Sequence, residues 1–138
     1  MTYEIKAWNL KDLLEAPEGA PLQSALDQIE ELTASFEGLR PKLAPDMADD
    51  DFMAAVKQAD AIYRAALPPI EYASLWFTED TQNQKALAFG GKMDQLYADL
   101  QNRILFFSLW WKGLEEADAA RLMDAAGPYR YWLEEMRH

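Results

Sequence analysis

The chain has 138 residues, of which half are hydrophobic and 27% are charged, and its formal net charge is −11. This length predicts a single domain with its own core, and this composition excludes a disordered protein. The negative charge repels phosphate backbones and anionic lipid surfaces, so nucleic acids and membranes are not expected partners.

Two further features of composition restrict the chemistry and the location. The chain has no cysteine, which excludes disulfides and thiolate metal sites. Residues 1–20 lack the basic and apolar regions of a secretory signal, and this predicts a cytoplasmic protein.

The first predicted helix lies between Pro21 and Gly38. Pro21 suits a first turn, Gly38 favours a stop, and the apolar residues between them recur at three- and four-residue spacing: Leu22, Leu26, Ile29, Leu32 and Phe36. A proline-rich connector, residues 39–51, follows and ends in three aspartates. Carboxylates are favoured at a helix start, whereas a calcium loop, the alternative for this triplet, needs alternating oxygen ligands and a closing glutamate that are missing.

The second predicted helix covers residues 52–66 and is broken or kinked by Pro68 and Pro69, because proline removes a backbone donor and clashes with the preceding turn. A short helix is expected over residues 70–77. Thr81 and Gln84 have the spacing of a capping box, which predicts that the next helix begins there.

One long central helix, about 81–114, is the strongest prediction of the sequence and is expected to be the longest element. Its apolar stripe keeps helical spacing throughout: Ala86, Phe89, Met93, Leu96, Leu100, Ile104, Phe107, Trp111 and Leu114. Shorter helices are expected at residues 116–126 and 129–138. Since no strand pattern alternates anywhere, the fold class is all-α, an elongated bundle of about five to six helices.

The end of this long helix is apolar on nearly every side. Outside the stripe it carries four more large apolar residues, Leu105, Phe106, Leu109 and Trp110, and these form the candidate interface. Such a helix is expected between two sets of neighbours. A span of about 50 Å at 1.5 Å per residue also exceeds the diameter of about 37 Å of a compact chain of this size. Ordinary core packing and a ligand pocket are the alternatives for these residues.

Catalytic chemistry is missing from the sequence. The only histidine is His138 at the last position, and no H-E-x-x-H, Ser-His-Asp or glycine-rich phosphate motif occurs. Glu79 and Asp80 are better explained by helix capping than by acid–base catalysis. We therefore expect no catalytic residue, no metal ligand and no cofactor-binding residue in this chain.

Four stretches together resemble the N-terminal helical region of oligoendopeptidase F-like zinc metallopeptidases, of the thimet oligopeptidase superfamily. They are "WNLKDLL" (8–14), "YASLWFTEDTQNQ" (72–84), "LQNRILFFSLWWKGL" (100–114) and "YRYWLEEMR" (129–137). In that family the helical region forms part of the wall of a peptide-binding channel, and a larger catalytic region carries H-E-x-x-H and zinc.

The resemblance implies that residues 1–138 are a non-catalytic N-terminal domain of a larger, cytoplasmic peptidase. Its partners would be the catalytic domain of the same polypeptide and, in the full-length enzyme, peptides; zinc would be bound outside this chain, which alone should be inactive. The alternative function is a stand-alone acidic interaction module that homodimerises through the candidate interface.

Overall fold

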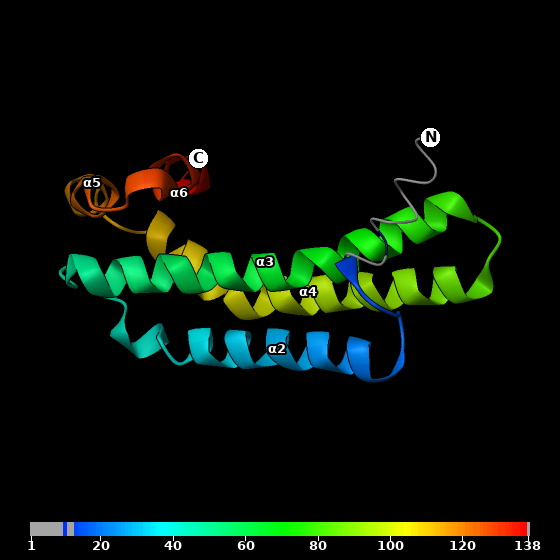
Figure 1. Cartoon of the computed structure of the whole chain (residues 1–138). Coiled ribbons are helices and arrows are strands. Elements are labelled where there is room, and N and C mark those ends of the chain that lie inside the picture. The colour runs from blue at the N-terminus through cyan, green and yellow to red at the C-terminus, as the bar shows by residue number, and fades with distance from the viewer. Residues whose placement is uncertain (1–9, 11–12, 138) are drawn as a thin grey trace.

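The computed structural model describes residue 10 and residues 13–137, and these residues form an all-α fold with five α-helices (Figure 1). The prediction of an elongated all-α bundle is therefore confirmed. Helices α2 (Gly19–Glu37), α3 (Asp49–Glu79) and α4 (Gln84–Lys112) run along the long axis. Helices α5 (Glu116–Asp124) and α6 (Arg130–Arg137) lie together at one end, and short 3₁₀ turns occur at Arg40–Lys42 and Gly127–Tyr129.

Helix α4 has the face that its sequence predicts. Seven of its residues are buried, and all of them belong to the predicted apolar stripe: Ala86, Phe89, Met93, Leu100, Ile104, Phe107 and Trp111. The helix continues through Gly90 and Gly91 without a break. It begins after Asn83, whose side-chain oxygen accepts hydrogen bonds from the backbone N–H groups of Lys85 and Ala86. The predicted Thr81–Gln84 capping box is therefore wrong, and Asn83 is the N-cap instead.

Helix α3 contradicts two predictions, a separate short helix over residues 70–77 and the greatest length for α4. It continues through Pro68 and Pro69 as one helix of 31 residues, so the prolines kink it and do not break it, and it is longer than α4, which has 29. Figure 1 shows α3 changing direction in its second half, which is the bend that prolines produce inside a helix. Burial on both sides of the bend, at Ala66 and Ala73, accounts for the continuity, because packing on α4 compensates for the missing backbone bonds.

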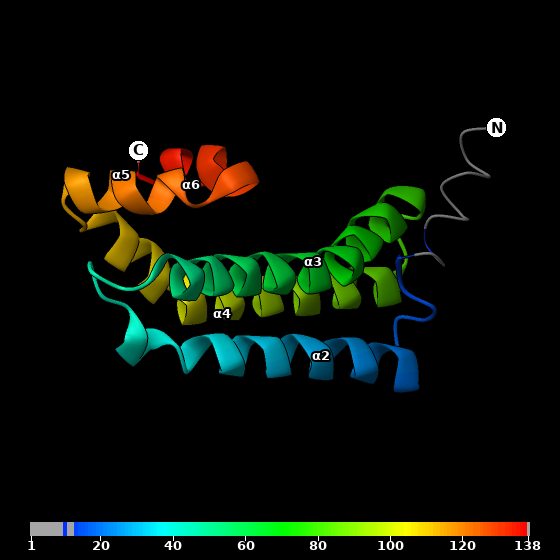
Figure 2. The ribbon, with the colours of Figure 1, turned by 60° about the vertical axis from the view of Figure 1, so that its left-hand side comes forward.

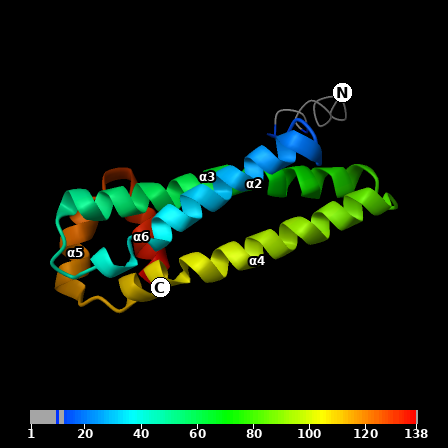
Figure 3. The same ribbon diagram turned by 90° about the horizontal axis from the view of Figure 1, so that it is seen from below.

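The helices share one main core and a smaller cluster near the α3–α4 turn. Helix α2 packs on both α3 and α4, and the view from below shows it lying across that pair (Figure 3). Buried residues from α2, α3, α4, α5 and α6 join in the main core. The smaller cluster contains Leu14, Leu22, Ala73, Phe89 and Met93. The three aspartates at 49–51 lie in the first turn of α3, as expected for helix-start carboxylates.

Candidate functional site

The C-terminal end of α4 is held by α6 through Trp111. This side chain is fully buried and stacks on Phe52 with a centroid separation of 5.3 Å. Its Nε1 donates a hydrogen bond to the carbonyl oxygen of Leu133 at 2.9 Å. Trp111 therefore links residues 100–114 to residues 129–137, which are two of the four stretches that carry the family resemblance.

Arg137 binds the same end of α4. Its guanidinium donates to the carbonyl oxygens of Trp111 and Leu114, at 2.6 and 3.0 Å, and lies 5.6 Å from the Trp111 ring centroid. The last carbonyls of a helix have no partner within the helix, and a cation is favoured beside them. Arg137 thus acts as a cap for α4, supplied by α6.

Two candidate interface residues, Phe106 and Trp110, are partly covered by other parts of the chain. The Phe106 ring lies 5.2 Å from Phe36 of α2, and the Arg40 guanidinium lies 5.6 Å from its centroid. The Trp110 ring packs 6.1 Å from Phe52 and is half-buried. Phe106 is thus covered from α2, and Trp110 from α3.

The other two candidate interface residues, Leu105 and Leu109, are exposed. Their exposed fractions are 47% and 58%, which are large for leucine on a helix between packed neighbours. The structure therefore does not gather the four residues into one patch. It leaves Leu105 and Leu109 uncovered and partly buries Phe106 and Trp110.

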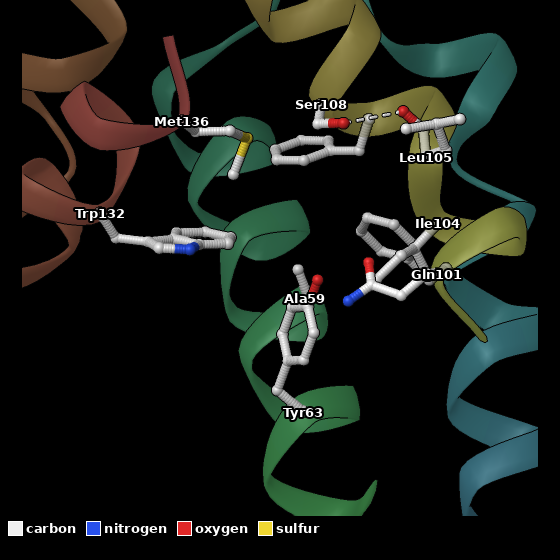
Figure 4. Close-up of a pocket in the computed structure, with 10 residues that line it drawn as sticks. Ala59, Tyr63, Gln101, Ile104, Leu105, Ser108, Trp132 and Met136 are labelled. Carbon is white, nitrogen blue, oxygen red and sulfur yellow. Dashed lines mark hydrogen bonds between the residues drawn. The ribbon is translucent and has the colours of Figure 1, made fainter. Parts of the chain in front are cut away.

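A small cavity lies between α3, α4 and α6 beside Leu105. Figure 4 shows Trp132 and Met136 of α6 facing Tyr63 of α3 and Gln101 of α4 across it. Burial raises the pKa of the Tyr63 hydroxyl, with a smaller contribution from Tyr97. The cavity volume is about 50 Å³, well below the roughly 300 Å³ at which small-molecule pockets begin. This space suits water and does not suit a peptide.

The one ionic network between α2 and α4 in the described part of the chain centres on Arg103. Its guanidinium bonds both carboxylate oxygens of Glu30, at 2.7 and 2.9 Å, and one oxygen of Glu37 at 2.6 Å. These hydrogen bonds raise the pKa of Arg103, and the bond from Arg103 lowers the pKa of Glu30. These bonds join α2 to α4, because the guanidinium of Arg103 pairs with both carboxylates. We assign the network a structural role.

The described residues contain neither a cluster of metal ligands nor a membrane-spanning helix. Among residue 10 and residues 13–137, no group of three or more His, Asp or Glu side chains is placed to hold a metal ion. Within the same residues, no helix is both long enough and apolar enough to cross a bilayer. His138 and most of the stretch "WNLKDLL" lie outside the described residues.

Besides Leu105 and Leu109, α3 and α4 carry other exposed apolar side chains that were not predicted from the sequence. Leu67, Phe77, Leu87 and Tyr97 are exposed by 52, 40, 44 and 44% of their area. Part of this surface could be placed from the sequence, because Leu87, Asp94, Gln101 and Leu105 follow one another at seven-, seven- and four-residue spacing and so share one side of the helix beside the buried stripe. The rest of the surface belongs to α3, and only the fold shows that α3 lies beside this side of α4.

Comparison of the chain with protein-family models, with curated proteins and with solved structures found no match.

Proposed function

We propose that this chain is a non-catalytic N-terminal domain of an oligoendopeptidase F-like zinc metallopeptidase, and that it serves as channel wall and scaffold. The observation that carries the proposal is the exposure of Leu105 and Leu109 in one of the four stretches that resemble the family. Large apolar side chains that neighbour each other on a helix commonly mark a contact with another protein surface.

The packing of α6 on α4 also supports this proposal. The stretches "LQNRILFFSLWWKGL" and "YRYWLEEMR" are separated by 14 residues, and the structure joins them through Trp111, Leu133 and Arg137. These contacts give the two motifs a common structural role, which is to fix the end of α4. A rigid end places Leu105 and Leu109 at a constant position, as a scaffold requires.

A second function is favoured by the same two leucines. An acidic interaction module that homodimerises would bury Leu105 and Leu109 against a second copy, and a two-fold dimer is the commonest such assembly. The two functions differ in the partner and therefore in the polypeptide that must be present to cover the leucines.

The double variant Leu105→Glu/Leu109→Glu separates the two functions. In the isolated chain we expect each change to alter the free energy of unfolding by no more than about 0.5 kcal/mol, because both side chains face water. In the complete peptidase the same charges would be buried without partners, and we expect a loss of about 2 kcal/mol or more in domain stability, measured by urea unfolding.

Sedimentation of the isolated chain completes this test. A dimer that the double variant converts to a monomer would favour the homodimer function over the peptidase domain. Equal losses of stability in the isolated chain and in the longer protein would contradict both functions, since the leucines would then be ordinary core.

A further inference from the structure

The pair α3–α4 is covered unequally on its two faces. Helix α2 lies along one face, whereas α5 and α6 lie on the opposite face and only at the end where α4 terminates (Figures 1 and 2). Towards the α3–α4 turn, this second face has no covering helix among the described residues. We call this uncovered part the open groove.

The open groove is apolar and has the size of a binding site for a helix. Its volume is about 470 Å³, and its walls include Ile70 and Phe77 of α3 and Leu87 and Met93 of α4. Phe77 and Leu87 are exposed by 40 and 44% although both are large apolar side chains. Leu67 of α3 and Tyr97 of α4 are further exposed apolar side chains of this helix pair. From residue 87 to residue 101, α4 offers about 21 Å, or about four turns.

Gly90 and Gly91 line this groove, and the groove is deeper at these positions because glycine has no side chain. A Cβ atom added at either position would meet no atom within 4 Å, so the space above the backbone is open. Glycine at a helix surface lets another helix backbone approach closely. It also costs about 1 kcal/mol against alanine in a helix interior.

The one charged residue among those that line the groove is acidic. It is Asp94, which forms no ion pair with another described residue. Arg64 of α3 is already bound to Asp60 at 2.8 Å. The lysines of this part of α4, Lys85 and Lys92, line a cavity with Tyr72 and Trp76 instead.

We propose that the open groove binds an amphipathic helix of a partner protein, one with an apolar stripe of about four turns flanked by lysine or arginine. The apolar stripe would cover Phe77 and Leu87, the glycines would admit the helix backbone, and the basic flank would pair with Asp94. A second copy of this chain is the poorer occupant, because each copy carries a net charge of −11 and brings carboxylates to the same rim. The inference does not depend on the peptidase proposal, since any protein that carries such a helix satisfies it.

The test uses designed helical peptides of about 16 residues as probes and the chain itself as the receptor. One peptide has a leucine stripe with lysine flanks, the second has the same stripe with glutamate flanks, and the third has the lysines with the leucines moved out of register. We expect fluorescence anisotropy to show binding of the first peptide at least tenfold tighter than that of the other two.

Variants of the chain locate the bound peptide. Gly90→Leu fills the groove and is expected to reduce binding of the first peptide at least tenfold while keeping or raising the unfolding midpoint, since leucine favours the helix. Asp94→Lys is expected to weaken binding about threefold to tenfold at low salt and less at high salt. Asp99→Lys, the same charge change on the same helix but beside the α2 cavity, should leave binding unchanged.

Three results would overturn the proposal. The first is binding of the leucine–lysine peptide that Gly90→Leu does not change, and the second is equal binding of the acidic and basic peptides or of neither. The third is a dimer of the chain that Gly90→Leu converts to a monomer, which would make the occupant a second copy.

Discussion

Replacement of Trp111 by alanine is expected to remove about 3–5 kcal/mol from the free energy of unfolding. The side chain is fully buried, stacks on Phe52 and donates a hydrogen bond to the Leu133 carbonyl, so its removal leaves a cavity and an unpaired acceptor. Domains of this size are stable by only about 5–15 kcal/mol. Urea unfolding followed by far-ultraviolet circular dichroism measures the loss.

Two further variants separate the causes of this effect. Trp111→Phe keeps an aromatic ring in the core and loses the indole donor, so we expect an intermediate loss of about 1–3 kcal/mol. Leu109→Ala removes an apolar side chain two residues away that is 58% exposed, and its effect should stay within about 0.5 kcal/mol. Similar losses for Trp111→Ala and Leu109→Ala would show that the packing described at the end of α4 is incorrect.

Arg137→Met is expected to lower the free energy of unfolding by about 2 kcal/mol, which is a large loss for a charged residue. The arginine side chain is only 13% exposed and donates charge-assisted hydrogen bonds to the carbonyls of Trp111 and Leu114. Methionine keeps most of the aliphatic contact and loses these bonds. Lysine should restore only part of the stability, because it lacks the planar fork that reaches both oxygens.

Arg130→Met is the matched control for this prediction. Arg130 lies on the same helix and forms two ion pairs, with Asp124 and Glu134, but its side chain is 51% exposed. Exposed ion pairs contribute about 0–1 kcal/mol, so the control should lose less than half of what Arg137→Met loses. Equal losses in thermal or urea unfolding would contradict the capping role of Arg137.

The parts of the fold that depend on local periodicity could be predicted from the sequence. The stripe of α4 was correct because one buried face at helical spacing needs no knowledge of its neighbours. The sequence left a break or a kink open at Pro68–Pro69, and the kink is found because packing around Ala66 and Ala73, which no local pattern reveals, opposes the local penalty of proline. The N-cap at Asn83 was missed because Thr81 is also a favoured capping residue.

The candidate site was less predictable than the fold. A helical wheel separates Phe106 from Leu105 by direction but cannot show that Phe36, 70 residues earlier, packs on Phe106 while Leu105 stays exposed. The open groove needs α3 and α4 to be antiparallel neighbours before Phe77 and Leu87 share one surface. Arg137 binds the carbonyl oxygens of Trp111 and Leu114 at the end of α4, a contact between helices that no local pattern indicates.

The most direct test of the proposed function is the mass and zinc content of the native polypeptide that contains these 138 residues. An antibody against the α2–α3 connector, residues 39–48, would isolate it, and intact-mass spectrometry with elemental analysis would characterise it. We predict a polypeptide much larger than 15.8 kDa that contains H-E-x-x-H beyond residue 138 and holds zinc in that region. A native polypeptide of 15.8 kDa without zinc would contradict the peptidase-domain proposal.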